Sequence, residues 1–215
     1  MTEAEWLASN DAQRMMQYLA GGPSPRKSRL FTVACCRRIG YLLTRKGREA
    51  VDAAERFADG LLEEPELTAA MGAVGRPRTN ARFRAAEAAR FTSYPPLTNW
   101  TPAAANVAVD AVGYDEHDRP IPEKRAAEES AQASLLRDIF GNPFRPAAVD
   151  PAWLTSTVVS LAEGIYAERA FDRLPILADA LQDAGCDNAD ILDHCRGPGP
   201  HARGCWVVDL LLGKT

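Results

Sequence analysis

Apolar residues recur at helical spacing along this chain, and Gly or Pro residues separate the stretches in which they do so. Spacings of three and four residues place side chains on one face of an α-helix. No stretch shows the alternation of apolar and polar residues that a half-buried strand requires. The sequence therefore predicts an all-α fold, an irregular multi-helix bundle of about eight to ten helices. Three stripes carry this prediction: Phe31, Cys35, Ile39 and Leu42; Leu154, Val158, Leu161 and Ile165; Phe171, Leu174, Leu177 and Leu181.

Two dipeptides, Ser24-Pro25 and Asp150-Pro151, are typical helix starts, because a capping side chain precedes a proline at the first helical position. We expect one helix to run from Pro25 to about Leu43. The alanines of residues 81–91 favour a further helix but add little apolar side chain, so we expect them to contribute little to a core.

Residues 92–122 form an irregular, Pro-rich middle segment, in which Pro95 and Pro96 exclude a regular helix. We expect one short helix from Thr101 and a polar loop from Gly113. A chain of 215 residues fits a single helical domain, 1–215. The weak helical pattern in the middle leaves an alternative, with lobes 1–91 and 123–215 joined by this segment.

Charge and hydropathy argue against a membrane-spanning protein and against a secreted one. The formal net charge is −4, and residues 1–90 hold 15 basic against 11 acidic side chains. No stretch approaches the roughly 20 apolar residues of a membrane helix, so we expect no membrane partner. The first residues are acidic and unlike a signal peptide, and an odd number of cysteines, five, suits a reducing compartment. We therefore expect a cytoplasmic protein.

Thiols and imidazoles are concentrated near the C-terminus, at Cys186, His194, Cys195, His201 and Cys205. Thiolate and imidazole are ligands that zinc prefers, and His201 and Cys205 have the spacing of half a finger-like site. The spacing of Cys186 and Cys195 departs from that pattern. Buried structural cysteines and a thiol nucleophile with a histidine base are the alternatives.

Basic residues cluster in the N-terminal part. Lys27, Arg38 and Arg45 are eleven and seven residues apart, which predicts one basic helix face. Such a face could bind the phosphates of nucleic acid, although a solvated, ion-paired face explains the same pattern and no reader motif accompanies it.

Segments at both ends of the chain resemble a family of uncharacterised paralogous proteins of planctomycete-type bacteria, a family without known activity. The resemblance implies a lineage and a cytoplasmic location, and no site. The segments that carry it are Ala4–Leu7, Arg29–Phe31, Ala34–Ile39, Leu136–Phe144, Leu174–Leu181, His194–Arg196 and Cys205–Val207.

No complete catalytic constellation is present in the sequence. The first hypothesis is therefore a non-catalytic helical interaction or scaffold module, with a protein partner and no cofactor. The alternatives are a zinc- or thiol-dependent protein built on the C-terminal cluster, and a nucleic-acid-associated protein that uses the basic face.

Overall fold

A computed structural model describes the chain except for residues 20–23, 78, 94–100, 116 and 215. The described residues form twelve α-helices and two single-turn 3-10 helices, η1 and η2. Among them, extended pairing is limited to an isolated bridge between Tyr114 and Pro120. The predicted all-α class is confirmed, and the helices exceed the eight to ten expected from sequence.

The chain packs as two compact units, Met1–Leu136 and Arg137–Thr215. The division falls inside one helix, α8 (Pro122–Phe140). It therefore lies away from the 92–122 segment at which the alternative lobes would divide. Folding of residues 1–215 as a single domain stays a prediction.

In the first unit, α3 lies at the centre and packs against α4, α6 and α7. It begins as predicted, because the Ser24 hydroxyl accepts the backbone N–H of Lys27 and Pro25 occupies the first turn. Leu30, Phe31 and Cys35 are fully buried along it. It ends at Arg38, earlier than expected, since Thr44 caps a new helix. The helices that precede α8 are α1 (Glu3–Ala8), α2 (Ala12–Leu19), α3 (Pro25–Arg38), α4 (Arg45–Ala58), α5 (Glu64–Gly72), α6 (Asn80–Thr92) and α7 (Thr101–Val112).

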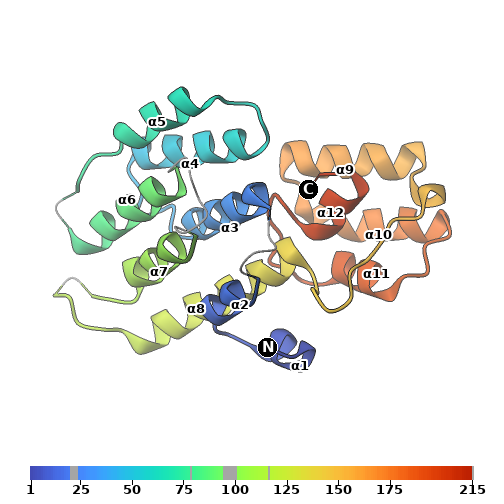
Figure 1. Ribbon diagram of the computed structural model, residues 1–215, viewed down its shortest axis with the longest axis horizontal. Helices are drawn as coiled ribbons and strands as arrows, with labels where there is room; N and C mark the ends of the chain where they lie inside the picture. The colour runs from blue at the N-terminus through green and yellow to red at the C-terminus, as the bar shows by residue number, and fades with distance from the viewer. Residues whose placement is uncertain (20–23, 78, 94–100, 116, 215) are drawn as a thin grey trace. The chain divides into compact units, whose positions relative to one another are not determined.

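The middle segment is more regular than its prolines predict. Its residues 101–112 form the three-turn helix α7, which packs along α6 (Figure 1). The short helix expected from Thr101 is thus present. The expected low core contribution of the α6 alanines is wrong, because alanines of both helices are almost completely buried. Small side chains let helices approach closely, on α6 toward α7 and, at Ala86, toward Ala50 and Val74. The buried alanines are Ala85, Ala86, Ala88 and Ala89 on α6 and Ala104, Ala105, Ala108 and Ala111 on α7. Pro95 and Pro96 lie outside the described residues.

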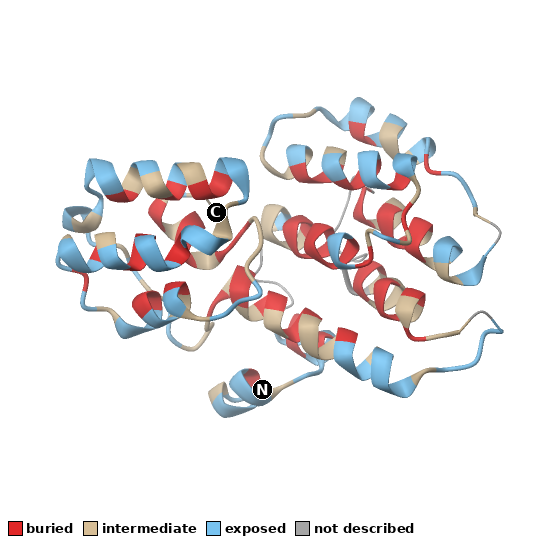
Figure 2. Cartoon of the chain, turned by 180° about the vertical axis from the view of Figure 1, so that it is seen from behind, coloured by how far each residue is buried: buried red, intermediate tan, exposed pale blue. Residues whose placement is uncertain are grey.

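The second unit has its own apolar core. Four helices follow the last turn of α8, and Figure 2 shows buried residues (red) recurring along α9, α10 and α11. Asp150 caps only the 3-10 turn η1 (Pro151–Trp153), and Thr155 then caps α9, so Leu154 lies outside the predicted stripe. The remaining elements are α9 (Ser156–Glu168), η2 (Phe171–Arg173), α10 (Leu174–Asp183), α11 (Ala189–Arg196) and α12 (Trp206–Leu211).

No helix in the described part of the chain combines the length and apolar character needed to cross a membrane.

Candidate metal centre

Four side chains with metal-ligating atoms converge in the second unit. They are Asp138 from the last turn of α8, His194 from α11, His201 from the turn after α11, and Cys205 at the start of α12. One ligand atom from each lies within 4.8 Å of the others. The four residues come from four segments, and they combine one oxygen, two nitrogen and one sulfur donor.

Local structure places each of these groups. Asp138 lies between the buried residues Leu136 and Ile139 on the core side of α8 and is 2% exposed. Asn188 caps α11 by accepting the Ile191 N–H, which fixes the helix that carries His194. The turn that follows reverses the chain through two glycines with positive φ, Gly199 and Gly204. Such φ values favour glycine, because side chains clash with the backbone there.

Asp138 is the hub of the cluster. Its Oδ1 lies 2.8 Å from Nδ1 of His201 and 3.2 Å from Nε2 of His194. Its Oδ2 accepts the backbone N–H of Ala202 at 2.8 Å. The Nε2 atom of His194 also lies 3.2 Å from Sγ of Cys205. One carboxylate oxygen is therefore held by the backbone, and the other faces both imidazoles.

His201 has an acceptor beside each ring nitrogen. Nδ1 lies 2.8 Å from Oδ1 of Asp138, and Nε2 lies 3.3 Å from the carbonyl oxygen of Gly197. A neutral imidazole carries one N–H and can donate to only one of these oxygens. An imidazolium, or a metal ion at Nδ1 with the hydrogen on Nε2, satisfies both contacts.

The pKa shifts favour a charged pair of Asp138 and His201. Burial disfavours the imidazolium form of His201, but the hydrogen bond and charge of Asp138 outweigh burial and raise the pKa of His201. Burial likewise disfavours the Asp138 carboxylate, but hydrogen bonds from His194 and His201 outweigh it and lower the pKa of Asp138. The centre thus favours an anionic carboxylate with a cation beside it.

Cys205 is a poor candidate for a nucleophile. It is fully buried, and burial, with the nearby charge of Asp138, raises the pKa of its thiol well above the usual value. A catalytic triad also requires the base to contact the nucleophile with one ring nitrogen and the acid with the other. Here the same Nε2 of His194 faces both Cys205 and Asp138. This arrangement does not match a cysteine triad.

Of the five metal ligands predicted from sequence, the structure places three in the cluster and two outside it. It brings His194, His201 and Cys205 together, whereas Cys186 and Cys195 lie outside this group, in the apolar core that also contains Cys205. Burial, with the neighbouring Cys186, raises the pKa of Cys195 to about 12, as expected for a thiol in apolar surroundings. Asp138 was not predicted from sequence. The signal that could have found it is a carboxylate at a core-facing position of a helix end, Leu135–Phe140, that is apolar apart from Asp138 and Arg137.

The expected basic helix face is not formed as predicted. Lys27 and Arg38 lie on α3, but Arg45 is the first residue of α4, because Ile39–Thr44 separate the two helices. Arg38 Nε donates to both carboxylate oxygens of Glu128, at 3.2 and 3.0 Å, and Arg45 donates to Glu49 at 2.6 Å.

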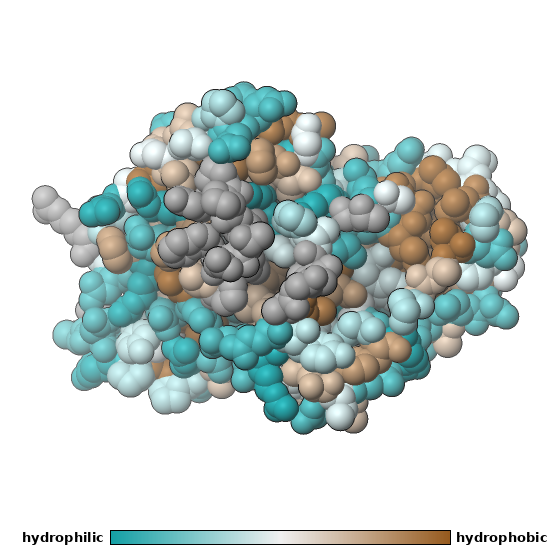
Figure 3. All heavy atoms as spheres, viewed as in Figure 1, coloured by the Kyte–Doolittle hydropathy of each residue, from teal (hydrophilic) through white to brown (hydrophobic). Residues whose placement is uncertain are grey.

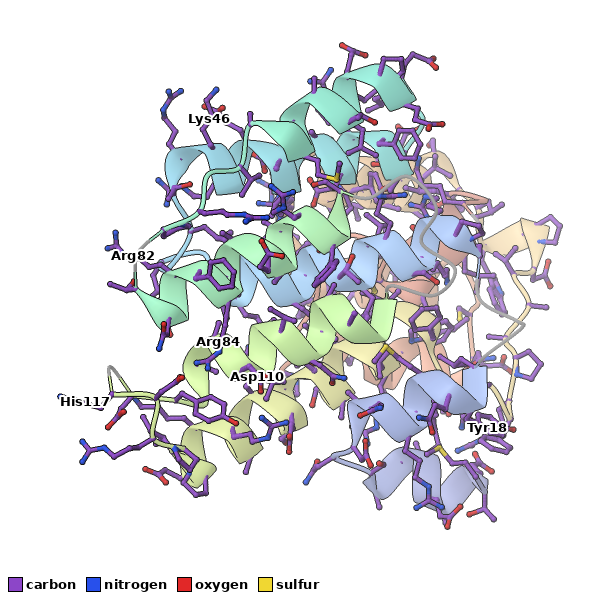
Figure 4. All side chains as sticks on the ribbon, turned by 60° about the vertical axis from the view of Figure 1, so that its left-hand side comes forward. Tyr18, Lys46, Arg82, Arg84, Asp110 and His117 are labelled. Atoms are coloured by element: carbon purple, nitrogen blue, oxygen red, sulfur yellow. The ribbon has the colours of Figure 1, made fainter. Side chains whose placement is uncertain are left out.

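Neighbouring basic side chains have acidic partners as well. Arg26 pairs with Asp59, and Arg37 pairs with Asp52. Lys46, labelled in Figure 4, lies 2.9 Å from Oε2 of Glu49. These pairs lower the positive charge that the unit presents to a polyanion.

Comparison of the chain with protein families, with curated proteins and with solved structures finds no match. The geometry of the centre therefore carries the functional argument.

Proposed function

We propose that residues 137–215 form a helical unit stabilised by a zinc ion bound to Asp138, His194, His201 and Cys205. The convergence of four ligand atoms within 4.8 Å carries the proposal. Carboxylate, imidazole and thiolate are the three side-chain types that bind zinc in proteins.

The separations suit a small tetrahedral ion. Ligand atoms at zinc distances of about 2.0–2.3 Å lie about 3.3–3.8 Å from one another. Three of the contacts in the cluster measure 2.8, 3.2 and 3.2 Å. Side-chain shifts of up to about 1 Å would open these contacts, and would close the wider separations of up to 4.8 Å, to the tetrahedral values.

The ligand set favours a structural role over a catalytic one. Structural zinc sites use four protein ligands, whereas catalytic sites use three and leave a position for water or substrate. Outer contacts also fix two of the ligands here. The Ala202 N–H holds the second oxygen of Asp138, and the Gly197 carbonyl orients the His201 ring. An ion at this position would tie α8, α11, the turn and α12 together.

The other hypotheses have less support. The Cys205 geometry disfavours thiol catalysis, and the ion pairs of Arg38 and Arg45 disfavour nucleic-acid binding. An interaction module stays a prediction. Figure 3 shows apolar side chains (brown) grouped on part of the surface of residues 137–215, and exposed apolar residues of this unit include Leu154 and Ile176. The cytoplasmic location and the planctomycete-type lineage stay predictions as well.

Elemental analysis of the purified chain tests the proposal. The wild-type protein, purified without chelators, should contain stoichiometric zinc. Cys205→Ala should lose it, and the matched variant Cys195→Ala should keep it, because both thiols are fully buried but only Cys205 belongs to the cluster. Circular dichroism confirms that both variants are folded. Absence of zinc from the wild type, even after zinc is added to the apoprotein, would refute the proposal.

A further inference from the structure

We infer that this centre selects divalent ions by charge, and that Asp138 and Cys205 together set the selectivity. The inference rests on the proposed metal site and goes beyond it, because it states which class of ion the site accepts and which it rejects.

The charges of the four ligands balance a divalent ion. Asp138 and the thiolate form of Cys205 each carry one negative charge, and two metal-bound imidazoles are neutral. A divalent ion therefore makes the group neutral, a monovalent ion leaves it negative, and a trivalent ion leaves it positive. Asp138 is 2% exposed and Cys205 is fully buried. A residual charge is costly at such a position, because burial removes it from water.

The donor atoms narrow the choice among divalent ions. Mg²⁺ and Ca²⁺ require six or more oxygen ligands. The cluster offers one carboxylate, and the Ala202 N–H already occupies its Oδ2. Thiolate and imidazole favour Zn²⁺ and Co²⁺ over Mn²⁺, which prefers carboxylate and water. Zn²⁺ also imposes no geometry of its own, so four ligands suffice.

Two variants separate the charge effect from the donor effect. Asp138→Asn removes one negative charge, which leaves the ligands balanced for a monovalent ion, and its single oxygen can bind the ion only by giving up the Ala202 N–H. Cys205→Asp keeps the charge but replaces sulfur with oxygen. Cys195→Ala, a buried thiol outside the cluster, serves as the control for both.

Competition titrations under reducing, oxygen-free conditions measure the selectivity. Asp138→Asn should raise the affinity for Cu⁺ relative to Zn²⁺ by about tenfold or more, because the Cu⁺ complex becomes the neutral one. Cys205→Asp should lower the preference for Zn²⁺ over Mn²⁺ by about tenfold or more, because the soft donor is lost. The control should leave both ratios unchanged.

The Co²⁺-loaded protein provides a second measurement. It should show sulfur-to-cobalt charge-transfer absorption in the wild type and the Cys195→Ala control, and none in Cys205→Asp. Wild-type protein that binds Zn²⁺ while both ratios stay the same in the variants would overturn this inference and leave the proposed zinc site standing. Wild-type protein that binds no metal would overturn both.

Discussion

His201 presents its Nδ1 atom to Oδ1 of Asp138 at 2.8 Å, across 63 residues of sequence. This contact joins the turn after α11 to the end of α8, and it is almost completely buried on the Asp138 side.

Removal of the Asp138 carboxylate should destabilise the protein even without metal. Asp138→Ala leaves the Ala202 N–H and two imidazoles without their acceptor, so we expect a loss of about 2–4 kcal/mol in the free energy of unfolding. Urea denaturation in the presence of a chelator measures it. Asp179→Ala is the control, because Asp179 is 73% exposed and its pair with Arg196 should contribute less than about 0.5 kcal/mol. Equal losses in the two variants would contradict a special role for Asp138.

Gly141 should not tolerate a side chain. Its φ is +66°, and a Cβ atom there would lie 3.1 Å from Cγ of Trp206, whose ring packs 5.2 Å from the ring of His194. Gly141→Ala should therefore cost about 1–3 kcal/mol and weaken zinc binding.

Gly164 provides the matched control for Gly141. It lies inside α9, and a Cβ atom added there would meet no atom within 4 Å, so Gly164→Ala should stabilise the protein by about 0.5–1 kcal/mol. Thermal unfolding of the two variants measures the difference. A neutral Gly141→Ala would show that the Trp206–His194 contact adjusts freely.

The native cysteines should resist alkylation. All five are buried free thiols, and burial raises the pKa of Cys36 to about 11 and that of Cys195 to about 12. At about pH 8 these groups remain protonated, whereas an unfolded thiol with a pKa of about 8.5 is partly thiolate and reacts. Mass spectrometry after iodoacetamide treatment should show labelling only in denaturant. Fast labelling of any of the five in the native protein would disagree with the described burial.

Metal removal should loosen the turn that carries His201. Zinc at 100 times its dissociation constant adds about 2.7 kcal/mol to the stability of the state that binds it. Chelation should therefore lower the unfolding temperature and speed tryptic cleavage after Arg196 and Arg203, which flank the turn. Readdition of zinc should reverse both effects in the wild type and have no effect in Cys205→Ala. Cleavage rates that do not change with zinc would contradict a zinc ion bound at this turn.

The ion pairs of the first unit should differ in value according to burial. Arg38→Met leaves Glu128, which is 6% exposed, without its charged partner and should cost about 2–4 kcal/mol. Arg45→Met breaks a pair between side chains that are 75% and 43% exposed and should cost less than about 0.5 kcal/mol. Urea denaturation of both variants measures the difference. If Arg38→Met lowers the free energy of unfolding as little as Arg45→Met does, the Arg38–Glu128 pair contributes no more than an exposed ion pair.

Part of the candidate site could be predicted from the sequence. His194, His201 and Cys205 lie within twelve residues and are joined by a Gly-Pro turn, so local geometry alone brings them close. Asp138 could not be predicted in the same way, because tertiary packing places α8 beside that turn. The sequence also could not separate the ligand Cys205 from Cys195. Cys195 follows Ile191 by four residues and shares its buried helix face, whereas His194 lies one position around the helix.

The fold could also be predicted only where the signal is local in sequence. The helix start at Ser24 follows from capping chemistry that is local in sequence. The start predicted at Asp150 was wrong for the long helix, because Asp150 caps only a 3-10 turn and α9 begins after Thr155. The length of α7 does not follow from local sequence, because it depends on contact with α6. Alanine's low hydrophobicity hides such a contact from a search for apolar periodicity.

The contact between α6 and α7 has a consequence for how this unit tolerates change. Alanine has no rotamers, so docking these faces costs almost no side-chain entropy, and the entropic cost is confined to the backbone. For the same reason, no side chain along the alanine faces can rotate to accept a larger neighbour. At Ala88 or Ala105, both fully buried, even one added methyl group must be accommodated by shifts of the surrounding backbone.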